Sequence, residues 1–159
     1  MSLPLTTNVL SKIFTHAETE YPEECCGIIF SDGKVRTAKN IQNELHRTNP
    51  ERYPRDARRG YTMSVDDILF LENSFSTRAP AVVIYHSHPD VGAYFSDEDK
   101  KKALFSGVPI YPVSYLVIDV RQGKAIEAVL FSYVGDEFRQ CQRLTVGPGD
   151  QKTEAKCQN

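Results

Sequence analysis

The chain has 159 residues, of which 40% are hydrophobic and 25% charged, a composition that is ordinary for a globular protein. Its net charge of −2 and pI near 6.1 give no electrostatic basis for binding nucleic acid, and no apolar run approaches the roughly 20 residues of a membrane span. The beginning of the chain lacks the charged and apolar regions of a signal peptide. We therefore expect a cytoplasmic protein that binds neither nucleic acid nor membrane.

The spacing of apolar residues predicts helices and strands along most of the chain. Pro22 ends an opening segment with helical spacing, and turn residues at 31–33 and 122–123 each join two segments that we predict to be hairpins. The expected elements are a helix over 9–21, strands over 25–30 and 35–41, a long loop over 42–60, a short strand over 61–63, a helix after Ser64, a strand over 81–86, a helix over 97–105, and strands over 113–120, 125–133 and 141–146.

This order of elements predicts an α/β (α+β) fold, in which helices pack on a mixed, largely antiparallel sheet. The length supports one hydrophobic core and is short for two domains. We predict a single domain over residues 1–146 and a polar tail over residues 147–159, which we expect to be disordered.

Two histidines, His86 and His88, come directly after the apolar run 81–85. Side chains at positions i and i+2 of a strand project from the same face, so both imidazoles can reach one ion. Ser96 is expected to cap a helix, and Asp99 in its first turn can reach back to complete a His₂Asp set. Three protein ligands with one open position are typical of catalytic zinc. Two histidines at a strand end are often only exposed polar residues, and Ser96 with Asp99 can be only a capping box, but the combination favours a metal site.

A candidate proton carrier, Glu24, lies where the first helix gives way to an apolar strand. A carboxylate at the edge of a buried strand is unfavourable unless it is paired or has a chemical role. Beside a water whose pKa zinc has lowered toward about 7, it can take the proton and pass it to a leaving amine. The alternative for Glu23 and Glu24 is that both are solvated acids after Pro22.

Taken together, Glu24-Cys25-Cys26-Gly27 and His86-Ser87-His88-Pro89, followed by Ser96 and Asp99, resemble the JAMM signature of MPN-domain metalloproteases over about residues 6–135. The resemblance implies a three-layer architecture related in outline to the zinc deaminases, whose own signature is absent here. It also implies roles: zinc ligands at His86, His88 and Asp99, a general acid/base at Glu24, and a hydrogen-bond donor to the oxyanion at Ser96. The Ser96 hydroxyl can instead cap the helix.

These expectations predict a Zn²⁺-dependent peptidase or isopeptidase. The amide chemistry follows from the site, whereas the substrate class follows from the resemblance alone. The resemblance implies hydrolysis near the C-terminus of a ubiquitin-like or sulfur-carrier protein, which would be the partner. The alternatives are a phage-tail or cell-wall-type peptidase of the same family and a non-catalytic MPN scaffold.

Some residues near the motifs have two interpretations. The segment 42–60 holds five arginines and three acids; it can bind a carboxylate, although a solvated surface is the favoured interpretation. His46 is interpreted as a loop residue and not as a fourth ligand, which would close the open zinc position. Tyr94 and Phe95 can line a substrate cleft or anchor their loop on the core.

The four cysteines do not have the spacing of a structural zinc site. Cys25 and Cys26 are adjacent in a predicted strand, so their side chains face opposite sides of the sheet. We expect both to be buried free thiols. Cys141 falls in the last predicted strand and Cys157 in the polar tail.

Overall fold

The computed structural model describes residues 2–146 and residue 157. Its helices and strands are α1 (Thr7–Glu20), β1 (Cys26–Phe30), β2 (Val35–Ala38), α2 (Gln42–Thr48), α3 (Val65–Ser74), β3 (Ala81–Pro89), α4 (Asp97–Ala103), β4 (Leu104–Phe105), β5 (Val108–Pro109), β6 (Ser114–Arg121), β7 (Lys124–Val134) and β8 (Glu137–Leu144). Within these described residues, no helix is long and apolar enough to cross a membrane.

Six strands form one sheet in the order β2-β1-β3-β6-β7-β8. Strands β3 and β6 are parallel and every other neighbouring pair is antiparallel, which confirms the predicted mixed sheet. A parallel pair needs a crossover connection, and here the segment that contains α4 and the small hairpin β4-β5 supplies it. Strand β3 therefore lies in the interior of the sheet, paired on both sides.

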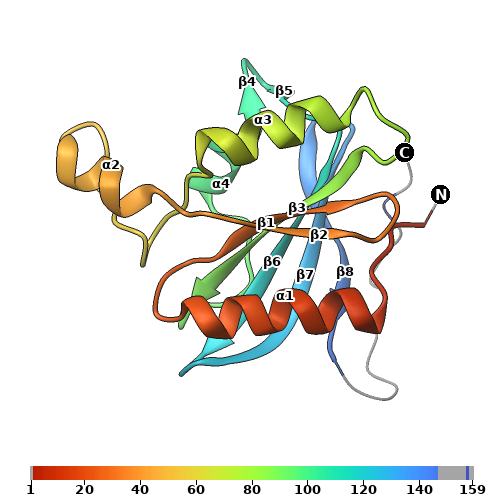
Figure 1. The fold of residues 1–159 in the computed structure, drawn as a ribbon, viewed down its shortest axis with the longest axis horizontal. Coiled ribbons are helices and arrows are strands. Elements are labelled where there is room, and N and C mark those ends of the chain that lie inside the picture. The colour runs from red at the N-terminus through yellow and green to blue at the C-terminus, as the bar shows by residue number, and fades with distance from the viewer. Residues whose placement is uncertain (1, 147–156, 158–159) are drawn as a thin grey trace.

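Helices cover both faces of the sheet, as Figure 1 shows, with α1 along one face and α3 and α4 on the other. The alternation of side chains along the strands divides the apolar core between these faces. On β3, Val83 and Tyr85 pack on the α1 side, whereas Ile84 packs on the α3 side. The three-layer arrangement predicted from the family resemblance is confirmed, and His86 follows Ile84 to the α3 side by the same alternation.

The prediction of one long loop over 42–60 was wrong, because residues 42–48 form α2. This helix buries only Gln42, so the sequence has no apolar stripe from which a helix could be predicted. The short strand expected over 61–63 is an isolated bridge between Met63 and Asn40. The helix expected over 97–105 ends at Ala103, where the chain turns into the hairpin β4-β5.

The cysteines divide into two groups. Cys25 and Cys26 are buried free thiols on opposite sides of the sheet, as predicted. Burial raises the pKa of the Cys25 thiol to about 12 and that of Cys26 well above its ordinary value, so neither is a reactive thiolate. Cys141 forms a disulfide with Cys157, a pairing that the sequence analysis did not predict. The rest of the predicted tail, 147–156 and 158–159, lies outside the described residues.

Gly27 is a position where a side chain cannot fit. It pairs with Tyr85 across β1 and β3, and a Cβ atom on Gly27 would clash with the Tyr85 ring. The Tyr85 hydroxyl is itself held by a 2.8 Å hydrogen bond with His16 Nδ1. We expect Gly27→Ala to displace the ring and lower the free energy of unfolding by about 1–3 kcal/mol, measured by urea unfolding. Gly60→Ala is the matched control, because its Cβ would meet only ordinary contacts at 3.7–3.8 Å; equal stability losses would contradict the explanation.

Candidate metal centre

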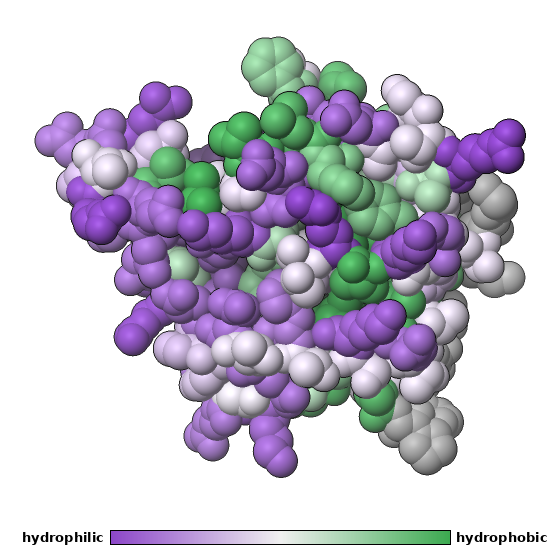
Figure 2. All heavy atoms as spheres, viewed as in Figure 1, coloured by the Kyte–Doolittle hydropathy of each residue, from purple (hydrophilic) through white to green (hydrophobic). Residues whose placement is uncertain are grey.

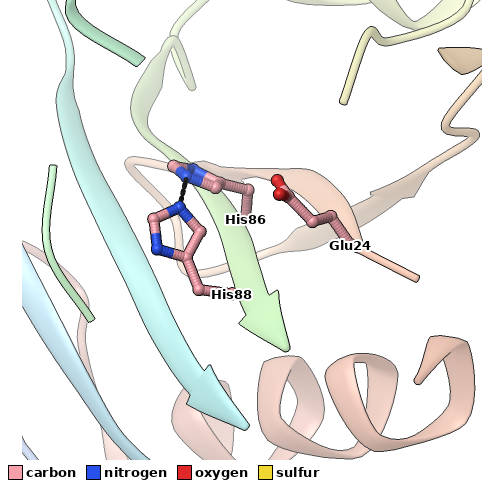
Figure 3. Close-up of side chains that lie close together, drawn as sticks. All are labelled: Glu24, His86 and His88. Carbon is pink, nitrogen blue, oxygen red and sulfur yellow. Dashed lines mark hydrogen bonds between the residues drawn. The ribbon is translucent and has the colours of Figure 1, made fainter. Parts of the chain in front are cut away.

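Strand β3 places two imidazoles side by side on the α3 side of the sheet. His86 is fully buried, His88 is 4% exposed, and their Nε2 atoms are 3.1 Å apart. Figure 3 shows both rings projecting from β3, with the side chain of Glu24 directed toward them from the chain just before β1. Glu24, His86 and His88 each offer a ligand atom, and these atoms lie within 4.8 Å of one another, so the group can bind a metal ion.

The carboxylate of Asp99 reaches the same point from α4. Its Oδ1 lies 3.2 Å from Nε2 of His86 and its Oδ2 lies 3.3 Å from Nε2 of His88. A capping box fixes this position: the Ser96 N–H donates to Asp99 Oδ2 and the Asp99 N–H donates to Ser96 Oγ, both at 3.0 Å. The helix start therefore aims the Asp99 carboxylate at the two histidines.

Backbone hydrogen bonds hold Glu24 in place. Its N–H donates to the carbonyl of Ala57 at 2.7 Å, and its carbonyl accepts from Nδ2 of Asn40 at 2.9 Å. The side chain is 6% exposed, and burial raises the pKa of its carboxyl to about 8. A carboxyl that titrates near neutral pH can both accept and release a proton during turnover.

Contacts with neighbouring residues orient the two histidine rings. The carbonyl of Gly92 lies 2.9 Å from Nδ1 of His88, so a neutral His88 donates a hydrogen bond to it. The Nε2 lone pair of His88 then faces His86 and Asp99, which together with His88 and Glu24 form the cluster. His86 stacks on Tyr61 with ring centroids 4.6 Å apart. Its Nδ1 has no hydrogen-bond partner among the described residues, so this ring is oriented by its packing on Tyr61 and by the contact of its Nε2 with Asp99.

The charges in the cluster depend on one another. Burial by itself would raise the pKa of the Asp99 carboxyl, but the charges and hydrogen bonds of the two histidines outweigh it and hold that pKa well below its usual range. Burial lowers the pKa of His86. Burial also opposes protonation of His88, yet hydrogen bonding to Asp99 and the charge of Glu24 leave its pKa raised. Asp99 is thus an anion that faces imidazole nitrogens.

The donor atoms match a zinc ion in type and in spacing. A tetrahedral zinc with ligand bonds of about 2.0–2.1 Å has ligand–ligand edges of about 3.3 Å. The two histidine Nε2 atoms are 3.1 Å apart, which is close to that edge. Asp99 places Oδ1 at 3.2 Å from Nε2 of His86 and Oδ2 at 3.3 Å from Nε2 of His88. Two imidazoles and one carboxylate are also a donor set that zinc enzymes use. These residues can therefore hold a metal ion, and their donor types suit zinc.

A cavity of about 670 Å³ opens onto the cluster, and Glu24, His88, Ser96 and Asp99 are among its lining residues. Tyr94 and Phe95, which had two interpretations, take one each. Tyr94 is 51% exposed in the cavity wall and packs edge-to-face on His88, whereas Phe95 is buried against Phe131 and Phe138.

The structure adds residues to the site that the sequence analysis did not identify. Lys102 lines the cavity, donates to the carbonyl of Tyr61 and places its ammonium 4.4 Å from that ring's centroid. Its position three residues after Asp99, on the same face of a helix, was the available signal. Tyr61 itself was predicted only as a strand residue. His46 is not a cavity residue: it lies in α2, where its Nδ1 pairs with the Tyr53 carbonyl at 2.7 Å.

Comparison with protein-family models matches residues 6–132 to the family of prokaryotic homologs of the JAB domain. The match covers most of the chain and includes Glu24, His86, His88 and Asp99. The chain belongs to this family. The resemblance to MPN-domain proteins is therefore confirmed at the level of the family.

One curated relative of this JAB-family chain is the tail tip assembly protein K of Escherichia phage N15. The two are 28% identical over 115 residues, which is 70% of this chain and 41% of the phage protein. The chain thus spans less than half the length of that relative.

Two solved structures have a similar fold. A protein of Desulfitobacterium hafniense aligns with a TM-score of 0.57 at 20% identity, covering 85% of this chain and 86% of its own. A protein of Salinibacter ruber aligns with a TM-score of 0.51 at 23% identity, covering 96% of this chain and 97% of its own. Both likenesses concern the fold alone.

Proposed function

We propose that this JAB-family chain is a zinc-dependent peptidase or isopeptidase. The observation that carries the proposal is the convergence of His86, His88 and Asp99 at 3.1–3.3 Å with the buried carboxyl of Glu24 beside them. In the proposal, the first three residues bind zinc and Glu24 carries the proton. A non-catalytic scaffold would not need this fourth residue, which supports catalysis over the scaffold alternative.

Glu24 and Ser96 have different roles in the proposed amide hydrolysis. When bound, zinc supplies Lewis acidity and lowers the pKa of a water molecule toward about 7. Glu24 accepts the proton of the attacking water and delivers it to the leaving nitrogen. Ser96 Oγ accepts the Asp99 N–H, and its own O–H donates to no acceptor among the described residues. Capping and oxyanion binding are therefore compatible, because the hydroxyl accepts in one role and donates in the other.

For the substrate, we propose a ubiquitin-like or sulfur-carrier protein cut near its C-terminus in the cytoplasm. This choice is supported by the resemblance to MPN-domain isopeptidases. The relative named as a tail tip assembly protein favours the second candidate, a phage-tail or cell-wall-type peptidase. The two candidates differ in substrate and share one chemistry.

Removal of the metal tests the shared chemistry. We expect zinc-loaded protein to hydrolyse a C-terminal fluorogenic amide of a ubiquitin-like protein or, under the second candidate, a cell-wall cross-link peptide. A chelator should abolish the rate and added zinc should restore it, because zinc held by His86, His88 and Asp99 would activate the attacking water. A chelator-resistant rate, or no rate on any amide with zinc bound, would contradict the proposed peptidase.

Ser96→Ala tests the oxyanion role. We expect kcat to fall about 10²–10³-fold with little change in KM, since the hydroxyl acts on the tetrahedral intermediate. The lost cap should also lower the free energy of unfolding by about 0.5–2 kcal/mol, measured by urea unfolding.

The variant Ser96→Asp separates these two effects. Aspartate caps helices well but puts an anion where the oxyanion forms. It should melt near wild type and yet be at least as inactive as Ser96→Ala, with zinc content checked in both. Near-normal turnover in zinc-loaded Ser96→Ala would confine Ser96 to capping.

A further inference from the structure

Four arginines after α2 line the cavity that opens onto the metal cluster: Arg52, Arg55, Arg58 and Arg59. All four are exposed. The sequence analysis favoured a solvated surface for this segment. In Figure 2, hydrophilic side chains predominate around α2, at the left of the view. The structure thus gives these arginines a specific location, the wall of the candidate active site.

Within the part of the chain that the structure describes, these arginines differ from most others because no acidic side chain forms an ion pair with them. Arg36, Arg121 and Arg139 each have a carboxylate oxygen within 3.0 Å, and Arg143 is paired with Glu127. None of the four cavity arginines forms an ion pair with a carboxylate among the described residues. Instead, Arg55 donates to the carbonyl of Arg59, and the guanidinium of Arg52 lies 5.5 Å from the centroid of the Tyr53 ring.

The balance of charge in the cavity wall favours an anion. The four arginines and Lys102 give five cationic side chains, against the carboxylates of Glu24, Glu51, Glu98 and Asp99. Two of those carboxylates, Glu24 and Asp99, belong to the metal cluster and face the histidines. Lys102 lies beside these cluster residues, so away from the cluster the four arginines face two acids, Glu51 and Glu98.

The arginine segment is also fixed to the cluster. The buried side chain of Gln42 donates to the carbonyl of Arg55 at 2.9 Å, and Asn43 Oδ1 accepts the N–H of Ala57 at 2.8 Å. The carbonyl of Ala57 accepts in turn from the N–H of Glu24 at 2.7 Å. The residue before Arg58 is therefore hydrogen-bonded directly to Glu24, the residue proposed to carry the proton.

We infer that these arginines bind carboxylate groups of the substrate, so that the site accepts an acidic peptide. Arginine suits this role because its planar fork binds a carboxylate through two parallel hydrogen bonds. The inference names a substrate class for the proposed peptidase and rests on that proposal for its biological meaning. Binding itself needs no hydrolysis, so it can be tested separately. The carboxylates can be acidic side chains or a free C-terminus.

The test is the binding of fluorescein-labelled hexapeptides, followed by fluorescence anisotropy at physiological ionic strength. Three probes are used: hexaglutamate with an amidated end, hexaglutamine with an amidated end, and hexaglutamine with a free acid end. The binding of each probe is measured with the Glu24→Gln variant, so that the probe is not hydrolysed during the measurement. We expect hexaglutamate amide to bind about tenfold or more tightly than hexaglutamine amide, because several exposed ion pairs form together.

The pairs Arg52→Gln/Arg55→Gln and Arg58→Gln/Arg59→Gln should each weaken hexaglutamate binding about tenfold. If one of these double variants misfolds, which a melting curve detects, the other still tests the inference. Arg78→Gln is the matched control, since Arg78 is exposed and lies outside the cavity. It should change the dissociation constant by less than about twofold, as expected for one remote surface charge.

The outcomes separate the inference from the proposed function. Tight binding of the free-acid hexaglutamine, lost in the arginine variants, would support the inference with the C-terminal carboxylate as the recognised group. Equal binding of all three probes would overturn it, as would folded arginine variants that bind every probe like wild type. Loss of binding in the arginine variants, with no amide hydrolysis by wild type, would support the inference and contradict the proposed peptidase.

Discussion

Protein that carries Asp99→Asn is expected to lose the zinc that the wild-type chain binds at about one ion per molecule. Asp99 supplies the negative charge that faces both histidines at 3.2 and 3.3 Å, and an amide oxygen is a much weaker zinc ligand. We expect the zinc dissociation constant to rise at least about 100-fold, since outer contacts alone cost 10–100-fold when removed. His88→Ala should have the same effect, because it deletes one of three ligands. Zinc titration with a competing chelator measures both.

The control for this prediction lies in the same helical turn. Asp97→Asn removes an exposed carboxylate from the start of α4 and should leave zinc affinity unchanged. Asparagine at position 99 can still accept the Ser96 N–H, so the capping box and the fold are expected to survive. Normal zinc affinity in Asp99→Asn, together with a loss in Glu24→Gln, would make Glu24 the third ligand in place of Asp99.

The parts of the site that the sequence predicted depend on structural rules that relate residues close together in the chain. Alternation along a strand placed His86 and His88 on one face, and capping chemistry placed Asp99 at the start of a helix. Both rules involve residues at most three positions apart. The same alternation separated Cys25 from Cys26 across the sheet, as the structure confirms.

The parts that the sequence missed depend on long-range contacts. Helix α2 is held by polar side chains, chiefly the buried Gln42, so its sequence has no apolar period. The sequence of the arginine-rich segment that follows α2 is compatible with a solvated surface and with a cavity wall, so it could not predict which of the two these arginines form. Tyr61 stacks on His86 across 25 positions in the chain, and Cys141 pairs with Cys157 beyond the last strand. No local pattern encodes these contacts.

Glu24→Gln is expected to keep the fold and the zinc and to lose turnover by about 10²–10⁴-fold. Glutamine has nearly the shape of glutamate, and the backbone bonds from Glu24 to Ala57 and Asn40 do not involve its side chain. An amide cannot take up the proton of the attacking water or pass it to the leaving amine. The loss should therefore appear in kcat, with KM little changed, in a steady-state assay on the same amide substrate.

Glu23→Gln is the matched control for this last prediction, one residue away. The Glu23 carboxylate is outside the metal group and accepts a hydrogen bond from Asn43 at 2.6 Å, which a glutamine oxygen can also accept. Its variant should therefore work at a rate near that of wild type. An inactive Glu23→Gln beside an active Glu24→Gln would move the proton carrier by one position. Because Glu24 is buried and Glu23 is partly solvated, the pair compares the same chemical change inside and outside the cluster.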